Sequence, residues 1–511
     1  MTILTTIFQF VLALISAVYN FLWGDILTIR LPGGSELGLS LLVLILIPAG
    51  IYFTVRTRFL PFRLFPEMIR VTLEKKHGAQ KDAISGLQAL IVSTATRVGM
   101  GNLVGVVAAI SMGGAGAVFW MWVTAIIGSA TAFIEATLAQ IYKEKDPLYG
   151  GYRGGPAYFI NRVRLITEVR EQDVFVENMS EKSDYISKDQ KHYEHGSGFR
   201  TIAVLFALSG LLCWGGISQV IGNSVSSAME NAFQIPPLVT SIVLVSLAAV
   251  IVLRKNATIK VLDIMVPIMA GCYFAITVFI IVKNAGQLPE IFSQIFSEAF
   301  GIRQVAAGGF GAVLMNGVKR GLFSNEAGSG SAPCAAAAAD ISHPAKEGLL
   351  QAFGVFIDTI VICSCSAMIM LLAPKEVVDG LAGMDLLQEA MRYHLGDFGV
   401  VFIAVILFLF SFSTFIGILF YARPNVAYLF GDNWTSQTIY KIIALVMLFV
   451  GGLAAYSFVW DLGDVGIGLM TIFNMMIILP LSGQAVNCLK DYERQMKASG
   501  GKQSVQRNGG E

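Results

Sequence analysis

The feature that most constrains this chain is a polar, glycine-rich stretch inside an apolar segment. The sequence SNEAGSGS occupies residues 324–331, and the apolar segment around it runs from about 305 to 339. A lipid-exposed segment could not carry such a break, because the freed N–H and C=O groups would find no partners in hydrocarbon. Broken backbone at membrane depth is tolerated where it lines a cavity, and such cavities bind solutes.

A second break lies far upstream. The sequence RVGMGN at residues 97–102 interrupts the apolar segment from about 86 to 112. Two interrupted membrane segments, one in each half of a chain, indicate the binding site of a secondary transporter. The alternative for Gly99, Gly101 and Gly105 is close helix packing, which small residues at this spacing also allow.

The composition is that of an integral membrane protein. Of the 511 residues, 55% are hydrophobic and 14% are charged, whereas soluble domains carry roughly 25% charged residues. The net charge of +1 gives no reason to expect a nucleic-acid partner. The six cysteines lack the spacing of a metal site and are predicted to be free thiols.

Eleven segments have the roughly 20 apolar residues that a membrane-spanning helix needs. We therefore predict an all-α membrane protein. The predicted spans lie near residues 36–56, 86–112, 114–141, 201–229, 235–253, 259–283, 305–336, 349–373, 398–421, 437–456 and 460–487. The apolar run at 3–23 is diluted by polar residues, and we expect it to lie at the membrane interface.

The distribution of Lys and Arg predicts the orientation. If the loop at 57–85 is cytoplasmic, the loops and tail on its side, counted from Arg56, hold 28 of the 36 Lys and Arg residues. The opposite side holds five, and three lie within membrane segments. Because basic loops stay in the cytoplasm, the N-terminus is expected outside and the C-terminus inside.

This topology divides the chain into four parts. Residues 1–85 hold the N-terminal segment, the first span and a cytoplasmic loop; 86–283 form one five-helix repeat, with a charged cytoplasmic insert at about 165–200. Residues 305–487 form a second five-helix repeat, and 488–511 a cytoplasmic tail. Since five is odd, the second repeat is inverted, and each repeat begins with its broken helix. That is the architecture of LeuT-type transporters.

The breaks have the polarity that an amino acid needs. The half-helix that begins near Asn102 points its N-terminal amides into the first break, where they favour a carboxylate. The half-helix that ends near Val98 offers unpaired carbonyls to a cation. At the second break, the carbonyls near Phe323 and Ser324 suit an ammonium group. Together the two breaks complement a zwitterion.

Several polar side chains lie inside predicted spans. Ionisable groups there are costly and usually paired. Those that lie well inside the spans and are considered as site candidates are Arg97, Lys319, Arg320, Glu135, Glu326 and Asp358. We expect Lys319 and Arg320 to brace the second break or to contact Glu326. For Glu135 and Asp358 the alternatives are pairing, water contact, or relay of a proton or cation. Ser411, Ser413 and Thr414 either bond back to carbonyls in their own helix or, in the case of Ser413 and Thr414, donate oxygens to a cation facing Ala95 and Val98.

The same stretches resemble a known family. TRVGMGNLVGVVAAISMGGAGAVFWMW (96–122), GGYRGGPAY (150–158) and GLFSNEAGSGSAPCAAAAA (321–339) look like signature blocks of the alanine/glycine:cation symporter family. The resemblance covers about residues 36–492. It implies a LeuT-like fold with one helix ahead of the five-plus-five core, and inward sodium flow coupled to the uptake of small amino acids.

The resemblance also implies site residues. Met100, Gly101 and Asn102 would meet the substrate carboxylate, and Phe323, Ser324 and Asn325 would face the substrate from the other break. By more distant similarity to LeuT-type sites, the Ala95 and Val98 carbonyls and the Ser413 and Thr414 hydroxyls would hold sodium.

Two positions depart from the family pattern. Many members have glutamine where Ile221 aligns and tryptophan where Ile418 aligns. Both positions are expected to face the substrate, so these isoleucines put alanine or glycine as the substrate in doubt.

The predicted function is sodium-coupled symport of a small neutral amino acid across the bacterial inner membrane. The alternatives are a proton-coupled carrier of the same fold, a carrier of a larger neutral amino acid such as glutamine, and an ion channel. A channel needs a continuous polar pore, which the sequence does not show. No hydrolase or phosphate-loop motif is present, so we expect no enzyme. The expected partners are the amino acid, sodium and the lipid bilayer, without an obligate protein partner. We expect no cofactor apart from sodium as the coupling ion.

Overall fold

A computed structural model describes residues 2–30, 36–74, 84–162, 197–254, 258–301, 309–454 and 456–508. The predicted charged insert at 165–200 lies almost wholly outside these residues. The N-terminal part contains α1 (Thr2–Trp23), β1 (Asp25–Arg30), β2 (Glu36–Ser40), α2 (Leu41–Arg56), α3 (Leu60–Arg63) and α4 (Phe65–Thr72). Strands β1 and β2 pair antiparallel beside α1 and α2.

The first predicted repeat corresponds to a run of long helices. Its elements are α5 (Gly86–Thr96), the π-helix η1 (Arg97–Gly105), α6 (Val106–Gly113), α7 (Gly116–Ile141), β3 (Glu144–Lys145), β4 (Tyr152–Arg153), α8 (Pro156–Asn161), α11 (Ser197–Phe233), α12 (Pro237–Val252) and α13 (Thr258–Lys283). The short η3 (Ala285–Gln287) and α14 (Leu288–Ala299) connect it to the second repeat.

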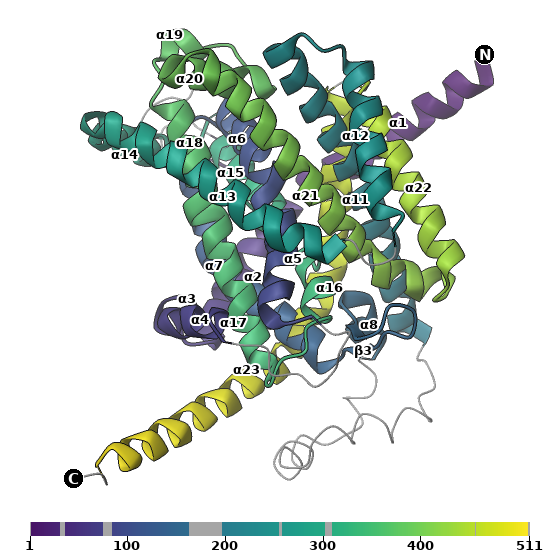
Figure 1. The fold of residues 1–511 in the computed structure, drawn as a ribbon, viewed down its shortest axis with the longest axis vertical. Coiled ribbons are helices and arrows are strands. Elements are labelled where there is room, and N and C mark those ends of the chain that lie inside the picture. Colours follow the sequence, from purple (N-terminus) through teal and green to yellow (C-terminus); the bar gives the residue numbers. More distant parts are fainter. Residues whose placement is uncertain are drawn as a thin grey trace.

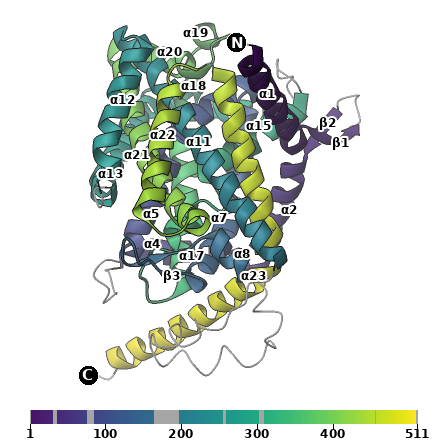
Figure 2. The same cartoon turned by 90° about the vertical axis from the view of Figure 1, so that its right-hand side faces the viewer.

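The second predicted repeat holds the other broken segment. Its elements are α15 (Gly309–Asn325), α16 (Ala332–Ala336), α17 (Pro344–Val355), the π-helix η4 (Phe356–Cys363), α18 (Ser364–Leu371), α19 (Lys375–Val378), α20 (Gly383–Leu395), α21 (Asp397–Phe430), α22 (Trp434–Gly451) and α23 (Tyr456–Asn508). Helix α23 continues beyond the bundle, and the two chain ends lie at opposite ends of the molecule (Figures 1 and 2).

Eight helices among the described residues are long and apolar enough to cross a membrane. They match eight of the eleven predicted spans. Two further predicted spans are shorter apolar helices, Leu41–Arg56 and Pro237–Val252. The remaining one, 305–336, contains the separate helices α15 and α16. The fold is thus an all-helical membrane bundle, although helix length alone does not give the count of eleven.

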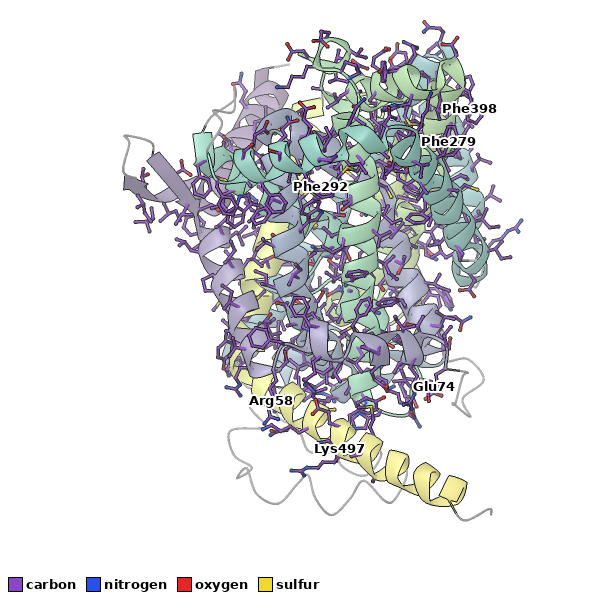
Figure 3. The ribbon with its side chains drawn as sticks, turned by 90° about the vertical axis from the view of Figure 1, so that its left-hand side faces the viewer. Arg58, Glu74, Phe279, Phe292, Phe398 and Lys497 are labelled. Atoms are coloured by element: carbon purple, nitrogen blue, oxygen red, sulfur yellow. The ribbon has the colours of Figure 1, made fainter. Side chains whose placement is uncertain are left out.

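The outer surface of the bundle is apolar, as contact with lipid requires. Helix α13 exposes 68% of Ile264 and 55% of Phe279. In Figure 3, Phe279, Phe292 and Phe398 lie on the upper half of the molecule, and Arg58 and Lys497 lie at its lower end. Such a band of exposed apolar side chains above a charged end is typical of a membrane protein.

Buried charges tie α15, the helix that precedes the break at residues 324–331, to α23. Arg320 donates from Nη1 and Nη2 to the two carboxylate oxygens of Asp464, at 3.1 and 3.0 Å. Lys319 Nζ lies 2.6 Å from Asp464 Oδ2. All three side chains are at most 5% exposed. The prediction that the two basic residues brace this helix agrees with these contacts, but the acid that they contact is Asp464 and not Glu326.

Replacing Asp464 with Asn should destabilise the protein strongly. The change leaves Lys319 and Arg320 buried without their counter-charge, and breaking a buried pair costs about 3–5 kcal/mol. Thermal unfolding of the purified protein in detergent measures the effect. Asp461→Asn, one turn away at a partly exposed position, is the matched control and should unfold near the wild-type temperature. Equal unfolding temperatures for Asp464→Asn and wild type would contradict the prediction.

Candidate functional site

The backbone leaves helical geometry inside the first break (residues 97–102). Val98 has ψ 71° and Gly99 has φ −147° and ψ −141°. A Cβ atom on Gly99 would lie 1.9 Å from Oγ1 of Thr414, so only glycine permits this approach between the break and α21. The second glycine of the break, Gly101, lies against Ser324: its Cβ would be 3.2 Å from the Ser324 Cα.

The second break (residues 324–331) is an irregular turn between two helices. Helix α15 ends at Asn325, and α16 begins at Ala332. Between them Glu326, Gly328 and Gly330 all have positive φ, at 57°, 98° and 83°. Positive φ is strained for a residue with a side chain, and therefore Glu326 is held in place by its surroundings.

One carboxylate joins the two breaks. Asn102 Nδ2 donates to Asp358 Oδ1 at 2.7 Å and to its backbone oxygen at 3.0 Å. Ser324 Oγ donates to Asp358 Oδ2 at 3.0 Å, and Thr359 Oγ1 donates to the same oxygen at 2.6 Å. The Asp358 side chain is fully buried. It therefore holds the two predicted site residues Asn102 and Ser324 on opposite oxygens of one group.

The side chain of Asn102 also stabilises its own break. Its Oδ1 accepts a hydrogen bond from Gly99 N at 2.9 Å. Asn325 acts similarly at the second break, where its Oδ1 accepts from Ala327 N at 3.0 Å and its Nδ2 donates to Thr359 Oγ1 at 3.3 Å. These amides satisfy backbone groups that the broken helices leave free. The geometry assigns both residues a structural part in the site, beside the predicted contact with substrate.

Phe323 lies beside side chains that surround the Lys319–Arg320–Asp464 ion pairs. Its ring lies 4.8 Å from that of Trp460, and the guanidinium of Arg320 lies 4.1 Å from the Trp460 ring. Trp460 is therefore a shared neighbour of Phe323, a predicted site residue, and of Arg320, which pairs with Asp464.

The predicted sodium ligands from α21 meet the first break. Ser413 Oγ and Thr414 Oγ1 lie 3.3 and 3.4 Å from the Ala95 backbone oxygen. Both hydroxyls also donate to Phe410 O, at 2.8 and 2.9 Å. The two interpretations of these hydroxyls are therefore compatible: they bond back within α21 and also reach Ala95. The non-helical ψ of Val98 sets its carbonyl apart from a regular helix.

The remaining predicted site residues are buried on the expected elements. Met100 N donates to Thr414 Oγ1 at 3.2 Å. Ile221 lies on α11 and Ile418 on α21, with 0% and 1% of their surface exposed, and these two helices pack together. Contact of either isoleucine with the substrate stays a prediction.

The sequence alone does not place Asp358 and Thr359 in the site. They lie in η4, a π-helical stretch inside a membrane segment, and π-helical turns are frequent at functional sites. The signal in the sequence is an Asp-Thr pair in the middle of an apolar run. Its partners, Asn102 and Ser324, are far away along the chain, so the sequence leaves pairing, water contact and relay open and does not identify a partner.

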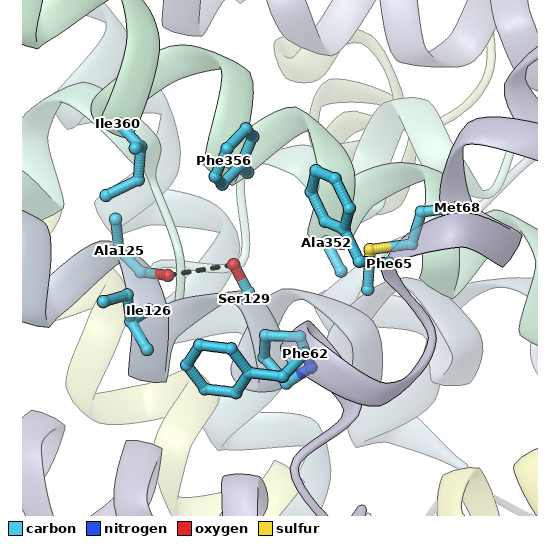
Figure 4. A pocket seen from close by; sticks show the side chains of 10 residues that line it. Phe62, Phe65, Met68, Ala125, Ile126, Ser129, Ala352, Phe356 and Ile360 are labelled. Atoms are coloured by element: carbon cyan, nitrogen blue, oxygen red, sulfur yellow. Dashed lines mark hydrogen bonds between the residues drawn. The ribbon is translucent and has the colours of Figure 1, made fainter.

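A separate apolar pocket of about 410 Å³ lies between α3, α4, α7 and the α17–η4 helix (Figure 4). Phe62, Phe65 and Phe356 contribute much of its wall. Its polar side chain, Ser129, donates to the Ala125 backbone oxygen at 2.9 Å. None of the predicted site residues lines this pocket, which offers an amino acid neither a charge nor a free hydrogen-bond group.

Known proteins resemble this chain over most of its length. The probable sodium/glutamine symporter GlnT of Bacillus subtilis is 41% identical over 463 residues, covering 90% of this chain and 89% of that protein. The sodium/alanine symporter AgcS of Methanococcus maripaludis is 32% identical, covering 95% of this chain and 98% of that protein. Among solved structures, MhsT in complex with L-phenylalanine matches with a TM-score of 0.53 at 12% identity, over 81% of this chain and 89% of that one.

The structural match supports the LeuT-like fold. The family assignment rests on the sequence. Residues 34–167 and 178–507 match the model of the sodium:alanine symporter family, so both breaks, Asp358 and the α21 hydroxyls all lie within the matched ranges. The chain belongs to the sodium:alanine symporter family.

Proposed function

We propose that this sodium-coupled amino-acid symporter binds a neutral amino acid between its two breaks. The observation that carries the proposal is the bridge from Asn102 through Asp358 to Ser324, which brings the amide end of one half-helix beside the carbonyl end of another. The substrate carboxylate would lie at Met100, Gly101 and Asn102. Its ammonium group would lie at the carbonyl end formed by residues 323–325. The family is one of transporters, and the chain is not an enzyme.

Sodium would bind where the first break meets α21. The Ala95 and Val98 carbonyls and the Ser413 and Thr414 hydroxyls are oxygen donors, which suit a hard cation. No other cofactor is needed for transport of this kind, because the sodium gradient supplies the free energy.

The architecture proposed for the chain has eleven spans. One precedes two inverted five-helix repeats, 86–283 and 305–487, and residues 1–85 and 488–511 flank them. The N-terminus is placed outside and the C-terminus in the cytoplasm of a bacterial inner membrane. The 28-to-5 distribution of Lys and Arg supports this orientation. The two chain ends also lie at opposite ends of the bundle (Figure 1).

The substrate is a small neutral amino acid of the alanine or glycine class, with a larger one such as glutamine as the second candidate. The name of the relative GlnT, a probable sodium/glutamine symporter, favours the second candidate. The sodium/alanine symporter AgcS favours the first. Ile221 and Ile418 would make the pocket wall apolar, because isoleucine neither donates nor accepts a hydrogen bond.

The function is tested by uptake into proteoliposomes. Radiolabelled alanine, glycine and glutamine are each offered with an inward sodium gradient, and again with potassium replacing sodium. We expect sodium-dependent accumulation of at least one of them. Accumulation that is equal without sodium would contradict sodium coupling, and single-channel currents through the protein would favour a pore.

Removing both α21 hydroxyls should weaken sodium binding. In the double variant Ser413→Ala and Thr414→Ala, loss of two oxygen ligands worth about 0.5–1.5 kcal/mol each should raise the half-saturating sodium concentration, by about fivefold to about 150-fold. Uptake at saturating sodium should change less. Ser411→Ala is the matched control, since Ser411 is equally buried on the same helix and its Oγ has no hydrogen-bond partner. A sodium dependence identical to wild type would leave the hydroxyls with their helix-internal bonds alone.

Ile418→Trp tests the pocket wall. The larger side chain should shrink the pocket and penalise larger substrates most. Competition of labelled alanine uptake by a graded series of neutral amino acids, in wild type and variant, measures the effect. If the rank order is the same in the two proteins, Ile418 does not line the site.

A further inference from the structure

Arg97 is a buried cation without an ion-pair partner among the described residues. Its side chain is fully buried at the start of η1. Nη1 donates to the backbone oxygen and to Oε1 of Gln351, at 3.2 and 3.3 Å. Nε and Nη2 have no hydrogen-bond partner. Buried polar atoms are nearly always satisfied, so the two unpartnered nitrogens of this side chain are able to bind a further acceptor, such as water.

Four buried carboxyl groups are close enough to Arg97 to interact with its charge. They are Glu135, Glu326, Glu347 and Asp358, and each is at most 5% exposed. One guanidinium cannot balance four carboxylates, and an uncompensated buried charge is very unfavourable. No group of three or more His, Cys, Asp or Glu side chains in the described part of the chain could hold a metal ion. Protons are therefore the natural means of neutralising part of this set.

Glu326 is the carboxyl group best placed to exchange a proton with the transport site. It directly follows the predicted site residues Ser324 and Asn325, in the left-handed conformation described above. Its Oε2 is buried and has no hydrogen-bond partner. A carboxyl oxygen that is free in this way accepts a proton without breaking an existing bond.

A hydrogen-bonded series of three side chains, Glu347, Gln351 and Arg97, begins at the end of the bundle assigned to the cytoplasm, and Arg97 lies within electrostatic reach of Glu326. Glu347 lies in the first turn of α17, where its Oε1 accepts from Gln351 Nε2 at 2.9 Å. Gln351 in turn accepts from Arg97. Glu347 Oε2 is also buried without a partner. Water is the partner that such groups take inside proteins, and water beside carboxyl groups carries protons.

The groups that act on Glu326 come from several elements. Arg97 and Asp358 act on it from η1 and η4, and Tyr421 and Thr96 lie beside it from α21 and α5. Two buried thiols, Cys334 and Cys213, also lie within its electrostatic reach. Glu135 of α7 contacts the second break itself, where its Oε2 accepts a hydrogen bond from Gly328 N at 3.2 Å. Arg97 is the one basic group of this set, so the charge on Glu326 depends on what else compensates it.

We propose that Glu326 carries a proton outward during the return of the empty transporter, so that a proton leaves the cell as sodium and amino acid enter. The proposal rests on the proposed sodium symport. Sodium at Ala95 would lie two residues from Arg97 and would help to balance the buried carboxylates. When sodium leaves to the cytoplasm, a hydronium ion supplied along Glu347 and Arg97 transfers its proton to the Glu326 carboxylate. The products are water and a neutral carboxylic acid, and the reverse transfer to water follows on the outer side.

Proteoliposomes loaded with the pH dye pyranine test this exchange. An inward sodium gradient is imposed, potassium is equal on both sides, and valinomycin holds the membrane potential at zero so that no potential drives proton leakage. L-alanine and L-glutamine are added outside in separate runs, and their radiolabelled uptake is measured in parallel. We expect the lumen to become alkaline only when sodium and a transported amino acid are both present.

Variants assign the proton to its residue. Glu326→Gln should keep sodium-driven uptake and amino-acid exchange but lose the alkaline shift, because its amide mimics the neutral acid. Glu347→Gln should slow the shift and leave exchange unchanged, and it decides the matter if Glu326→Gln does not fold. Glu298→Gln is the control, since Glu298 is a buried acid on α14 that accepts from Gly116 N at 3.3 Å and is not one of the four carboxyl groups around Arg97; it should behave as wild type.

The outcomes separate the two proposals. Sodium-driven uptake without an alkaline shift, or with an acid shift, overturns the proton proposal and leaves the symport intact. An alkaline shift of wild-type size in both Glu326→Gln and Glu347→Gln overturns the assignment to this route. If no amino acid accumulates with sodium, the symport falls and the proton proposal falls with it.

Discussion

The carboxyl group of Asp358 is the constraint on which the central site depends. A broken helix inside a membrane has free backbone groups and no fixed direction beyond the break. Here Asn102 and Ser324, from the two breaks, bind the two oxygens of one carboxyl group. The position of one half-helix relative to the other is therefore set by a third helix. Because η4 is π-helical at this point, its own backbone is less regular, and Asp358 can present its carbonyl as well as its carboxylate to Asn102.

The buried charges near Trp460 and those around Arg97 are arranged differently. On the side of Trp460, Lys319 and Arg320 are neutralised directly by Asp464, with short ion pairs. Around Arg97 the charges are close enough to interact but form no ion pair among the described residues, and several polar atoms lack a partner. Direct pairs hold elements together, since breaking them costs several kcal/mol. Groups that interact without pairing can change their protonation at lower cost.

The sequence is sufficient to locate both breaks, because glycine and polar residues inside an apolar membrane segment are tolerated only where the backbone lines a cavity or packs closely. It cannot assign partners. Asp358 binds Asn102 and Ser324, which are separated from it by 256 and 34 positions in the sequence. Helical periodicity predicts contacts only between residues a few positions apart. Asp464 does not stand out as an intramembrane acid, because it lies near the start of the 460–487 segment. The short helices α4, α14 and α20 are also not predicted, since their length and mixed composition resemble loops.

The structure suggests a physical reason for coupling between ion and substrate. Thr414 Oγ1 accepts the amide hydrogen of Met100, at the end of the half-helix that is proposed to bind the substrate carboxylate. The same hydroxyl lies 3.4 Å from the Ala95 carbonyl, a proposed sodium ligand. Gly99 leaves no space between the break and this hydroxyl. A cation that draws the Thr414 oxygen toward Ala95 must therefore also move the Met100 amide, so that ion and substrate both act on one hydrogen bond.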